Sequence, residues 1–165
     1  MEVTLKQATA AQAVAIAKVR MATNEKLTRE FGRGPWTSTV TEKGVLYGMR
    51  TGRVYMARGG RTIIGTLQLT TTKPWAIDKK YFSKCERPLY LLAMAVEPDQ
   101  QRRGIGRAML EDLKRVVKAW PGDAIRLDAY DLPGGGGEFY AKCGYREKGR
   151  VTYRGAPLIY YELLL

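Results

Sequence analysis

The sequence predicts an α/β fold in a single domain, residues 1–165, with a mixed central sheet and helices on both of its faces. Strand-like and helix-like segments follow one another in the order strand, helix, helix, three strands, helix, strand, helix and two strands. Residues 89–96 are almost continuously apolar, which is typical of a central strand covered on both faces. A long amphipathic helix follows this strand, and these two segments organise the rest of the chain.

The first part of the chain predicts a strand, two helices and a hairpin. Thr9 can cap a helix that runs to about Leu27. Its small apolar face consists of Ala10, Ala13, Val14, Ala17 and Met21. The other predicted elements are a strand at 3–7, a loop at 31–37, a weaker helix at 38–49, and strands at 53–58 and 62–71 that flank a Gly-Gly turn.

The second part predicts the central strand, a long helix and the elements that return to the sheet. A longer connection, 72–88, leads into the strand 89–96. In the long helix the residues spaced three or four apart form one apolar stripe: Ile105, Met109, Leu113, Val116 and Trp120. A strand at 124–130, a short helix at 138–142 that ends at Gly144, and strands at 145–153 and 158–164 complete the chain.

The loop between the central strand and the long helix has the composition of an anion site. It reads Gln101-Arg102-Arg103-Gly104-Ile105-Gly106, with Arg107 next. A helix start leaves backbone N–H groups without partners and carries partial positive charge, and the two glycines let a phosphate approach the backbone. The loop is neither a G-x-x-x-x-G-K-[ST] phosphate loop nor a G-x-G-x-x-G dinucleotide loop.

Composition excludes several classes of protein. The chain is 45% hydrophobic, which argues against disorder, and no apolar run approaches the length of a membrane span. With no His and two cysteines, Cys85 and Cys143, we expect neither a metal site nor a disulfide framework. The start of the chain lacks the apolar region of a signal peptide, so we expect a cytoplasmic protein. The net charge of +12 favours anionic partners, either a phosphorylated cofactor or nucleic acid.

The string Gln101-x-x-Gly104-x-Gly106, placed between an apolar strand and a striped helix, resembles the Q/R-x-x-G-x-G/A signature of the GNAT acetyltransferases. The element order is similar to that family over essentially the whole chain. The resemblance implies that the middle strands splay apart and that acetyl-coenzyme A is the cosubstrate. It places the cofactor on the strand end and the loop: Met94, Ala95, Val96, Gln101, Arg102, Arg103, Gly104, Ile105, Gly106 and Arg107.

Acetyl transfer to an amine requires a neutral amine, a donor for the developing oxyanion and a proton for the leaving thiolate. Phe139-Tyr140-x-x-x-Gly144-Tyr145 resembles the family's F-Y-x-x-x-G-F segment, which makes Tyr140 the candidate general acid. Asp128, on the strand after the long helix, is the candidate base, and Glu97 at the end of the central strand competes with it. Without His, direct transfer in a ternary complex is simpler than a route through an acetylated cysteine.

The chain departs from the family pattern before Tyr140. Many members have Asn seven residues before the Tyr and Ala four before it, where this chain has Pro133 and Gly136. Pro has no donor, so the cofactor contact made by that Asn is in doubt, and Asp131 is the available substitute. Four successive glycines at 134–137 make this loop either mobile or closely approached.

The sequence leaves the amine acceptor open among an amino acid, an antibiotic, a polyamine and a protein N-terminus. Trp36, Trp75, Tyr81 and Phe82 line a pocket or cover the sheet edge, and Glu30 or Asp78 attracts a cationic amine. The function we predict is an N-acetyltransferase for primary amines. The alternatives are a non-catalytic acyl-coenzyme A sensor and a basic nucleic-acid-binding protein, although no RNA-recognition motif is present and nucleic acid is not expected. The sequence does not decide whether the protein forms a homodimer.

Overall fold

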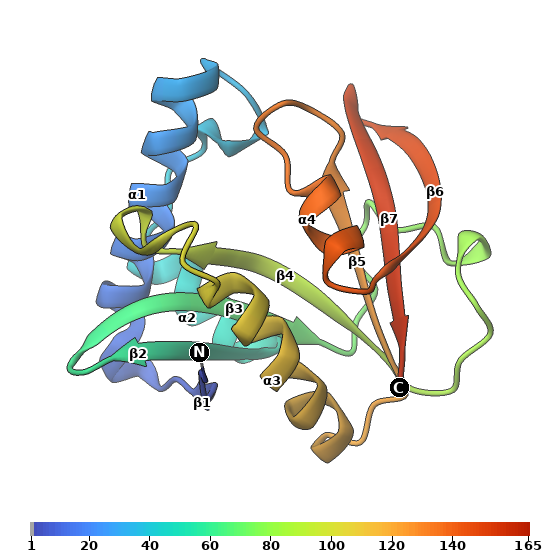
Figure 1. Cartoon of the computed structure of the whole chain (residues 1–165), viewed down its shortest axis with the longest axis horizontal. Coiled ribbons are helices and arrows are strands. Elements are labelled where there is room, and N and C mark those ends of the chain that lie inside the picture. Colours follow the sequence, from blue (N-terminus) through green and yellow to red (C-terminus); the bar gives the residue numbers. More distant parts are fainter. Residues whose placement is uncertain (1) are drawn as a thin grey trace.

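The computed structural model describes residues 2–165, and within that range seven strands form one mixed sheet in the order β1-β2-β3-β4-β5-β7-β6 (Figure 1). The strands are β1 (Lys6–Gln7), β2 (Arg53–Gly59), β3 (Thr62–Thr70), β4 (Pro88–Val96), β5 (Ala124–Tyr130), β6 (Arg146–Tyr153) and β7 (Ala156–Leu164). β4 and β5 pair in parallel, whereas all other neighbours are antiparallel. The predicted α/β fold with a mixed sheet is confirmed.

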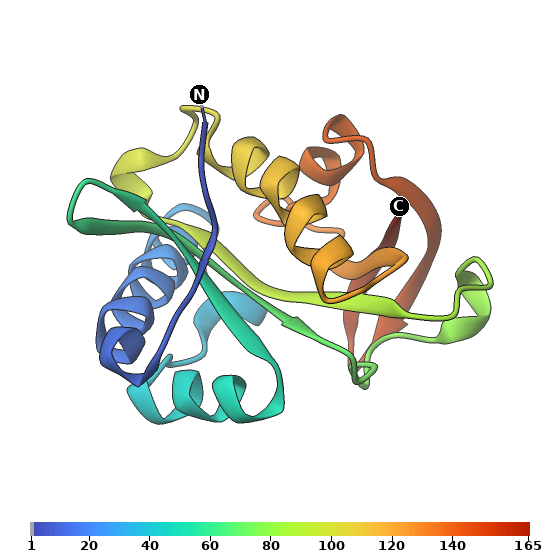
Figure 2. The same cartoon turned by 90° about the horizontal axis from the view of Figure 1, so that it is seen from below.

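Helices cover both faces of this sheet (Figure 2). On one face lie α1 (Ala13–Phe31) and α2 (Glu42–Thr51), and on the other lie α3 (Ile105–Ala119) and α4 (Gly137–Lys142). Four short 3-10 turns complete the described elements: η1 (Ala10–Gln12), η2 (Pro35–Thr37), η3 (Lys79–Tyr81) and η4 (Pro98–Gln100). None of the described helices is both long enough and apolar enough to cross a bilayer.

The helix α3 follows the predicted stripe closely. Met109 and Leu113 are fully buried, and they pack against Leu67, Leu69 and Leu127 of the sheet. Trp120, just after the helix, is only partly buried, and the guanidinium of Arg53 stacks over its ring with 4.0 Å to the centroid. The amphipathic period therefore predicted both the helix and its packing face.

The boundaries predicted for the first two helices were wrong. Thr9 caps η1, where its backbone N–H donates to Gln12 Oε1 at 2.8 Å, and α1 begins after that turn and continues to Phe31. The buried face of α1 consists of Ala13, Ile16, Ala17 and Val19, and Val14 is 48% exposed. The helix α2 begins after Thr41, whose Oγ1 accepts from the Gly44 N–H at 3.1 Å.

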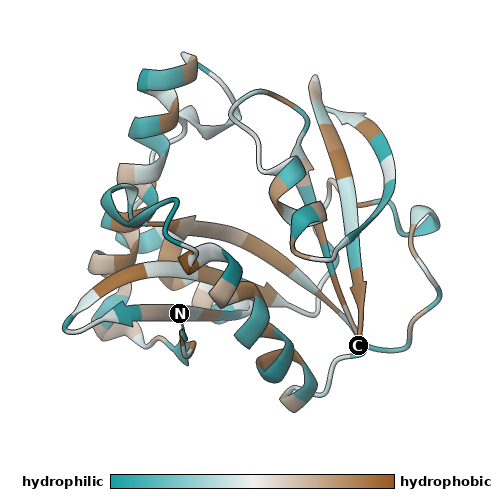
Figure 3. Cartoon of the chain, in the orientation of Figure 1, coloured by the Kyte–Doolittle hydropathy of each residue, from teal (hydrophilic) through white to brown (hydrophobic). Residues whose placement is uncertain are grey.

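The middle of the sheet opens. β4 and β5 pair only over residues 88–90 and 124–126, although both strands continue beyond this point. β4 also contains a bulge, because the register with β3 shifts between Leu92 and Ala95, and Ala93 has φ +50°. The two strands diverge visibly in Figure 1, and apolar residues run along β4 in Figure 3. The opening exposes the backbone of β4 just before the Gly loop.

A buried ion pair secures the closed end of the sheet. Arg126 Nε donates to Glu162 Oε2 at 3.0 Å, and both side chains are almost fully buried. Arg126 Nη1 also donates to the Tyr90 hydroxyl at 3.3 Å. Removing one partner of such a pair leaves a buried charge uncompensated, which is costly. The pair thus fixes β5 next to β7, and the hydrogen bond from Arg126 to Tyr90 holds β5 next to β4 just before those two strands separate.

Candidate active site

The Gly loop forms the start of α3. Gly104 is the N-cap residue with φ +84°, a left-handed conformation that side chains rarely adopt. No side chain caps the helix, so the amides of its first residues, Ile105, Gly106 and Arg107, have no partner within the helix. A Cβ at Gly106 would meet the Phe139 ring at 3.1 Å. Glycine is therefore needed at the two positions for different reasons: backbone conformation at Gly104 and close packing at Gly106.

The side chain of Gln101 braces this loop. Its Nε2 donates to the Val96 carbonyl at 3.0 Å, and its Oε1 accepts from Lys26 Nζ at 2.8 Å. Thr23 Oγ1, one turn earlier on α1, lies 3.3 Å from the same Val96 carbonyl. The Gln therefore connects the end of β4, the loop and α1, and it determines the shape of the loop.

A cavity of about 410 Å³ lies beside the start of α3. Two arginines, one glutamate and smaller or apolar residues line it: Arg103, Arg107, Glu111, Gly104, Ala108, Leu110 and Cys143. Arg107 Nη1 donates to the Lys142 carbonyl at 3.1 Å, which links α3 to the end of α4. Free amides, a helix N-terminus and arginines in one concave place suit a phosphate group. Arg102, with φ +62°, is exposed on the same loop.

Tyr140 extends from α4 to the opening in the sheet. Its ring packs against Phe139, Tyr145 and Tyr161, with centroids 5.2, 5.9 and 6.0 Å away. Its hydroxyl lies 3.9 Å from the sulfur of Met94, on β4 just after the bulge. Burial raises the pKa of Tyr140, and the nearby charge of Asp128 raises it further. The phenol is therefore a protonated donor at neutral pH.

Asp128 lies on β5 beyond the last pair with β4, across the register from Tyr160. It shares a sheet face with Arg126, opposite the α3 face that Leu127 and Ala129 take. Burial raises the pKa of Asp128, and among residues 2–165 it has no ion-pair or hydrogen-bond partner. Its charge acts on the hydroxyls of Tyr130, Tyr140 and Tyr160. A carboxylate in this position can accept a proton.

Glu97 lies at the end of β4, where its N–H donates to the Ile64 carbonyl at 2.8 Å. Burial raises the pKa of Glu97, and the neighbouring Asp99 raises it further. The charge of Asp128 raises the pKa of Tyr140, whereas the charge that acts on Glu97 comes from Asp99 in the loop after β4. Asp128 and Glu97 both remain candidate bases.

The loop before α4 is closely approached by other parts of the chain, which was one of the two alternatives that its glycines predicted. A Cβ at Gly134 would lie 2.9 Å from both Phe31 and Trp36, so this loop packs against the end of α1 and the turn after it. The carboxylate of Asp131 pairs with Arg150 Nη1 at 3.2 Å, an interaction made within the protein. The close approach explains a glycine at this point of the loop.

The residues suggested for an acceptor pocket divide into several groups. Tyr81 and Phe82 pack against Tyr160 at 5.4 and 5.2 Å, and so cover the end of the sheet. Trp75 is 89% exposed, whereas Trp36 is buried. Glu30 lies 3.9 Å from Lys26, and Asp78 caps η3 through the Lys80 N–H. Of the four aromatic residues, only Trp36 contacts the loop beside the opening.

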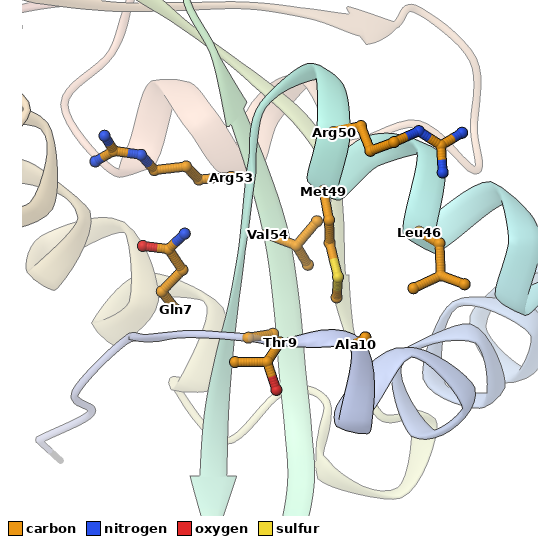
Figure 4. Close-up of a pocket in the computed structure, with 9 residues that line it drawn as sticks. Gln7, Thr9, Ala10, Leu46, Met49, Arg50, Arg53 and Val54 are labelled. Carbon is orange, nitrogen blue, oxygen red and sulfur yellow. The ribbon is translucent and has the colours of Figure 1, made fainter.

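A second cavity, of about 340 Å³, lies away from the Gly loop, between β1, η1, α2 and β2 (Figure 4). Val54, Met49 and Leu46 make its walls apolar. Figure 4 shows the guanidinium groups of Arg50 and Arg53 pointing in opposite directions, so the two do not form a clamp for an anion. No group of three or more His, Cys, Asp or Glu residues in the described part of the chain could hold a metal ion.

Residues 50–147, more than half of the sequence, match the model of a protein family described as acetyltransferase (GNAT) domain. The chain belongs to the GNAT acetyltransferase family. It is an acyltransferase of that type, as the loop signature and the order of the elements predicted. A search of curated proteins finds no match.

Solved structures of GNAT proteins share the fold at low sequence identity. A GCN5-related N-acetyltransferase from Rhodopseudomonas palustris is 19% identical, with a TM-score of 0.71 over 100% of this chain and 97% of that one. Ribosomal-protein-alanine N-acetyltransferase from Brucella melitensis is 14% identical, with a TM-score of 0.72 over 98% and 99%. The yncA protein of Salmonella typhimurium, solved with its cofactor acetyl-CoA, is 15% identical, with a TM-score of 0.70 over 100% and 95%.

The residues of this GNAT chain fit acetyl-coenzyme A, the cosubstrate of the family. The uncapped start of α3 and the adjoining basic cavity suit a pyrophosphate. The unpaired ends of β4 and β5 leave backbone groups at Met94, Ala95 and Val96 beside the opening. In this structure the Val96 carbonyl accepts from Gln101 Nε2, and Arg107 Nη1 donates to the Lys142 carbonyl.

Proposed function

We propose that the protein is an N-acetyltransferase that moves an acetyl group from acetyl-coenzyme A to a primary amine by direct transfer in a ternary complex. One observation carries this proposal: Tyr140 and Asp128 approach the opening between β4 and β5 from its two faces, and the charge of Asp128 raises the pKa of the Tyr140 hydroxyl. Tyr140 belongs to the α3 and α4 face, and Asp128 to the α1 and α2 face.

In this proposal each substrate binds on its own face of the sheet. The Gly loop and α3 hold the cosubstrate, through the amides of 104–107 and the charges of Arg102, Arg103 and Arg107. Bound there, acetyl-coenzyme A supplies the acetyl group as a thioester. The acceptor then enters from the α1 and α2 face, which keeps the two substrates from competing for one space. Both must be present together for transfer.

Two side chains move the protons. Asp128 accepts a proton from the acceptor's ammonium group, directly or through a water, so that the amine is neutral when it attacks. The raised pKa of Asp128 brings it closer to working pH, which makes it a better matched base than an exposed carboxylate. Tyr140 donates its hydroxyl proton to the leaving sulfur, and the tyrosinate takes the second proton that the acetylated nitrogen loses, while Asp128 returns its proton to water. Glu97 remains the competing base through a water chain.

The test is an acetyl-transfer screen across amine classes, with release of coenzyme A measured by a thiol reagent and the product by mass spectrometry. We expect binding of acetyl-coenzyme A by calorimetry and turnover with at least one amine class. Binding without turnover on any amine would instead support the sensor function. If the protein neither binds acetyl-coenzyme A nor acetylates any amine, the proposal is wrong.

A further inference from the structure

Arg20, on α1, carries a charge for which the protein provides no partner. Its Nε and Nη2 are both buried, and neither makes a hydrogen bond within residues 2–165. No acidic side chain in that range forms an ion pair with it, although nine other ion pairs are present. Burial lowers the pKa of Arg20 to about 10, so it is still cationic at pH 7. Arg20 as a whole is only partly buried, but a charge whose buried donors lack partners costs free energy in a folded protein, and a bound anion would relieve that cost.

The position of Arg20 puts it on the acceptor side of the sheet. It follows Ile16 by one turn and precedes Thr23 by one turn, and both of those residues face the sheet. The helix α1 packs on the face that α2 also covers, opposite α3 and the Gly loop (Figure 2). Asp128 lies on this same face. A ligand of Arg20 is therefore on the side of the acceptor.

The free edge of this guanidinium matches one chemical group. Nε and Nη2 are the two parallel donors that hold a carboxylate in a bidentate pair. The same edge of Arg115 does this elsewhere in the chain, where Nε and Nη2 each lie 2.8 Å from an oxygen of Asp112. In Arg20 both donors are without a partner. The edge is thus shaped for a planar carboxylate supplied from outside the chain.

Contacts about three turns beyond Arg20, at the end of α1, limit the size of the ligand that we expect. The end of α1 and the turn after it contact the loop before α4, because a Cβ at Gly134 would lie 2.9 Å from atoms of both Phe31 and Trp36. The rings of Phe31 and Trp36 pack edge to face, with centroids 6.2 Å apart. These contacts join α1 to the loop that follows β5, across the divergence of the strands (Figure 1). A bulky acceptor would have to break them.

We infer that Arg20 binds the carboxylate of the acceptor, and that the acceptor is a small amino carboxylate, a compound with a free amine and a free carboxylate. This inference rests on the proposed function, because Asp128 and Tyr140 then act on the amine. Arg20 is a specificity residue: it selects the acceptor through a group that does not react.

The experiment compares amines that differ only in the carboxylate. Glycine, β-alanine, 4-aminobutyrate and 6-aminohexanoate vary the spacing between the two groups, and the amide of each removes the charge. We expect wild-type protein to prefer one acid over its amide by at least about tenfold in kcat/KM. Arg20→Met should reduce that preference by about ten- to a hundredfold, mainly through KM, and leave the amide unchanged.

Two matched variants separate the role of Arg20 from charge and from packing. Lys18→Met removes one exposed positive charge from the same helix, and it should leave the preference unchanged. In ligand-free protein Arg20→Met should keep or raise the melting temperature, because it removes an unpaired buried charge. If Arg20→Met lowers the melting temperature by several degrees and the preference for the acid survives, Arg20 is a structural residue and the inference is wrong.

A binding measurement keeps the inference separate from the proposed function. Calorimetry with 4-aminobutyrate and the other acids, in the presence of coenzyme A, should show binding to wild-type protein and at least about tenfold weaker binding to Arg20→Met. If amines are acetylated with no preference for a carboxylate, the proposed function stands and the inference fails. If no amine is acetylated, the proposed function fails, and the inference is decided by whether binding of the acid depends on Arg20.

Discussion

Replacing Tyr140 with Phe removes one hydroxyl group and keeps the ring in its aromatic cluster. The ring contacts with Phe139, Tyr145 and Tyr161 do not involve the hydroxyl. The only hydrogen-bond partner of the hydroxyl within residues 2–165 is the Met94 sulfur at 3.9 Å, which is a weak acceptor at the limit of distance. Tyr140→Phe should therefore cost less than about 1 kcal/mol of stability, or about 2–4 °C in melting temperature.

The effect on catalysis should be much larger. A positioned acid typically contributes 10²–10⁴-fold, so kcat should fall by at least about tenfold, allowing for water as a substitute donor. The affinity for acetyl-coenzyme A, measured by calorimetry, should change little, because the proton is needed only when the C–S bond breaks. Since the pKa of Tyr140 is raised, wild-type kcat should show no loss from tyrosine ionisation up to about pH 10.

The matched control is Tyr145→Phe. Its hydroxyl is buried and has no hydrogen-bond partner within residues 2–165, and its ring lies 5.9 Å from that of Tyr140. Removing an unsatisfied buried hydroxyl should leave kcat unchanged and slightly raise the melting temperature. Initial rates of coenzyme A release by both variants, with the amine that the screen identifies, decide the question. If Tyr140→Phe turns over like wild type, Tyr140 only packs α4 and the assignment of the acid is wrong.

Three further predictions concern the loop, the base and the cysteines. Gly104→Val should weaken acetyl-coenzyme A binding strongly, because it forces a β-branched residue to φ +84°. Gly106→Val should also weaken binding, because its side chain pushes the Phe139 ring. Unchanged affinities of both variants in calorimetry would contradict the assignment of this loop to the cofactor. Asp128→Asn should lower kcat, most at low pH, and yet raise the melting temperature at pH 7. The reason is that the raised pKa of Asp128 makes its ionisation destabilising, so stability is lost as pH rises through that pKa, and the two proteins should converge below about pH 4 in thermal unfolding. The Cys85→Ser, Cys143→Ser double variant should retain most activity, since burial raises the pKa of both thiols, and an inactive but folded variant would indicate an acetylated cysteine.

The sequence by itself determined the central unit of the fold. The strand β4, the Gly loop and the helix α3 are each specified by residues close together in the sequence, so local composition and periodicity predict them. The same is true of the strands that flank the Gly-Gly turn and of the helix that ends at Gly144. These local signals were enough to predict the element order, the family and the position of Tyr140.

Only the tertiary structure decided how the candidate site is arranged. The bulge at Ala93 and the early end of pairing between β4 and β5 leave no mark in the sequence, because strand register depends on partners far along the chain. Whether Asp128 or Glu97 meets Tyr140 depends on which faces of the sheet the helices cover. That the Gln101 side chain also connects the end of β4 to α1 is seen only in its contacts.

The role of Arg20 on α1 was likewise not predictable from the sequence. The predicted apolar face included Val14, and Ile16 and Val19 were overlooked, so a charged residue on the buried face went unnoticed. The spacing of Ile16 and Arg20, four residues apart, was a visible signal that both share one face. That no acidic residue pairs with this charge is a property of the packed molecule, since any of the 16 Asp and Glu residues is a potential partner until the fold separates them.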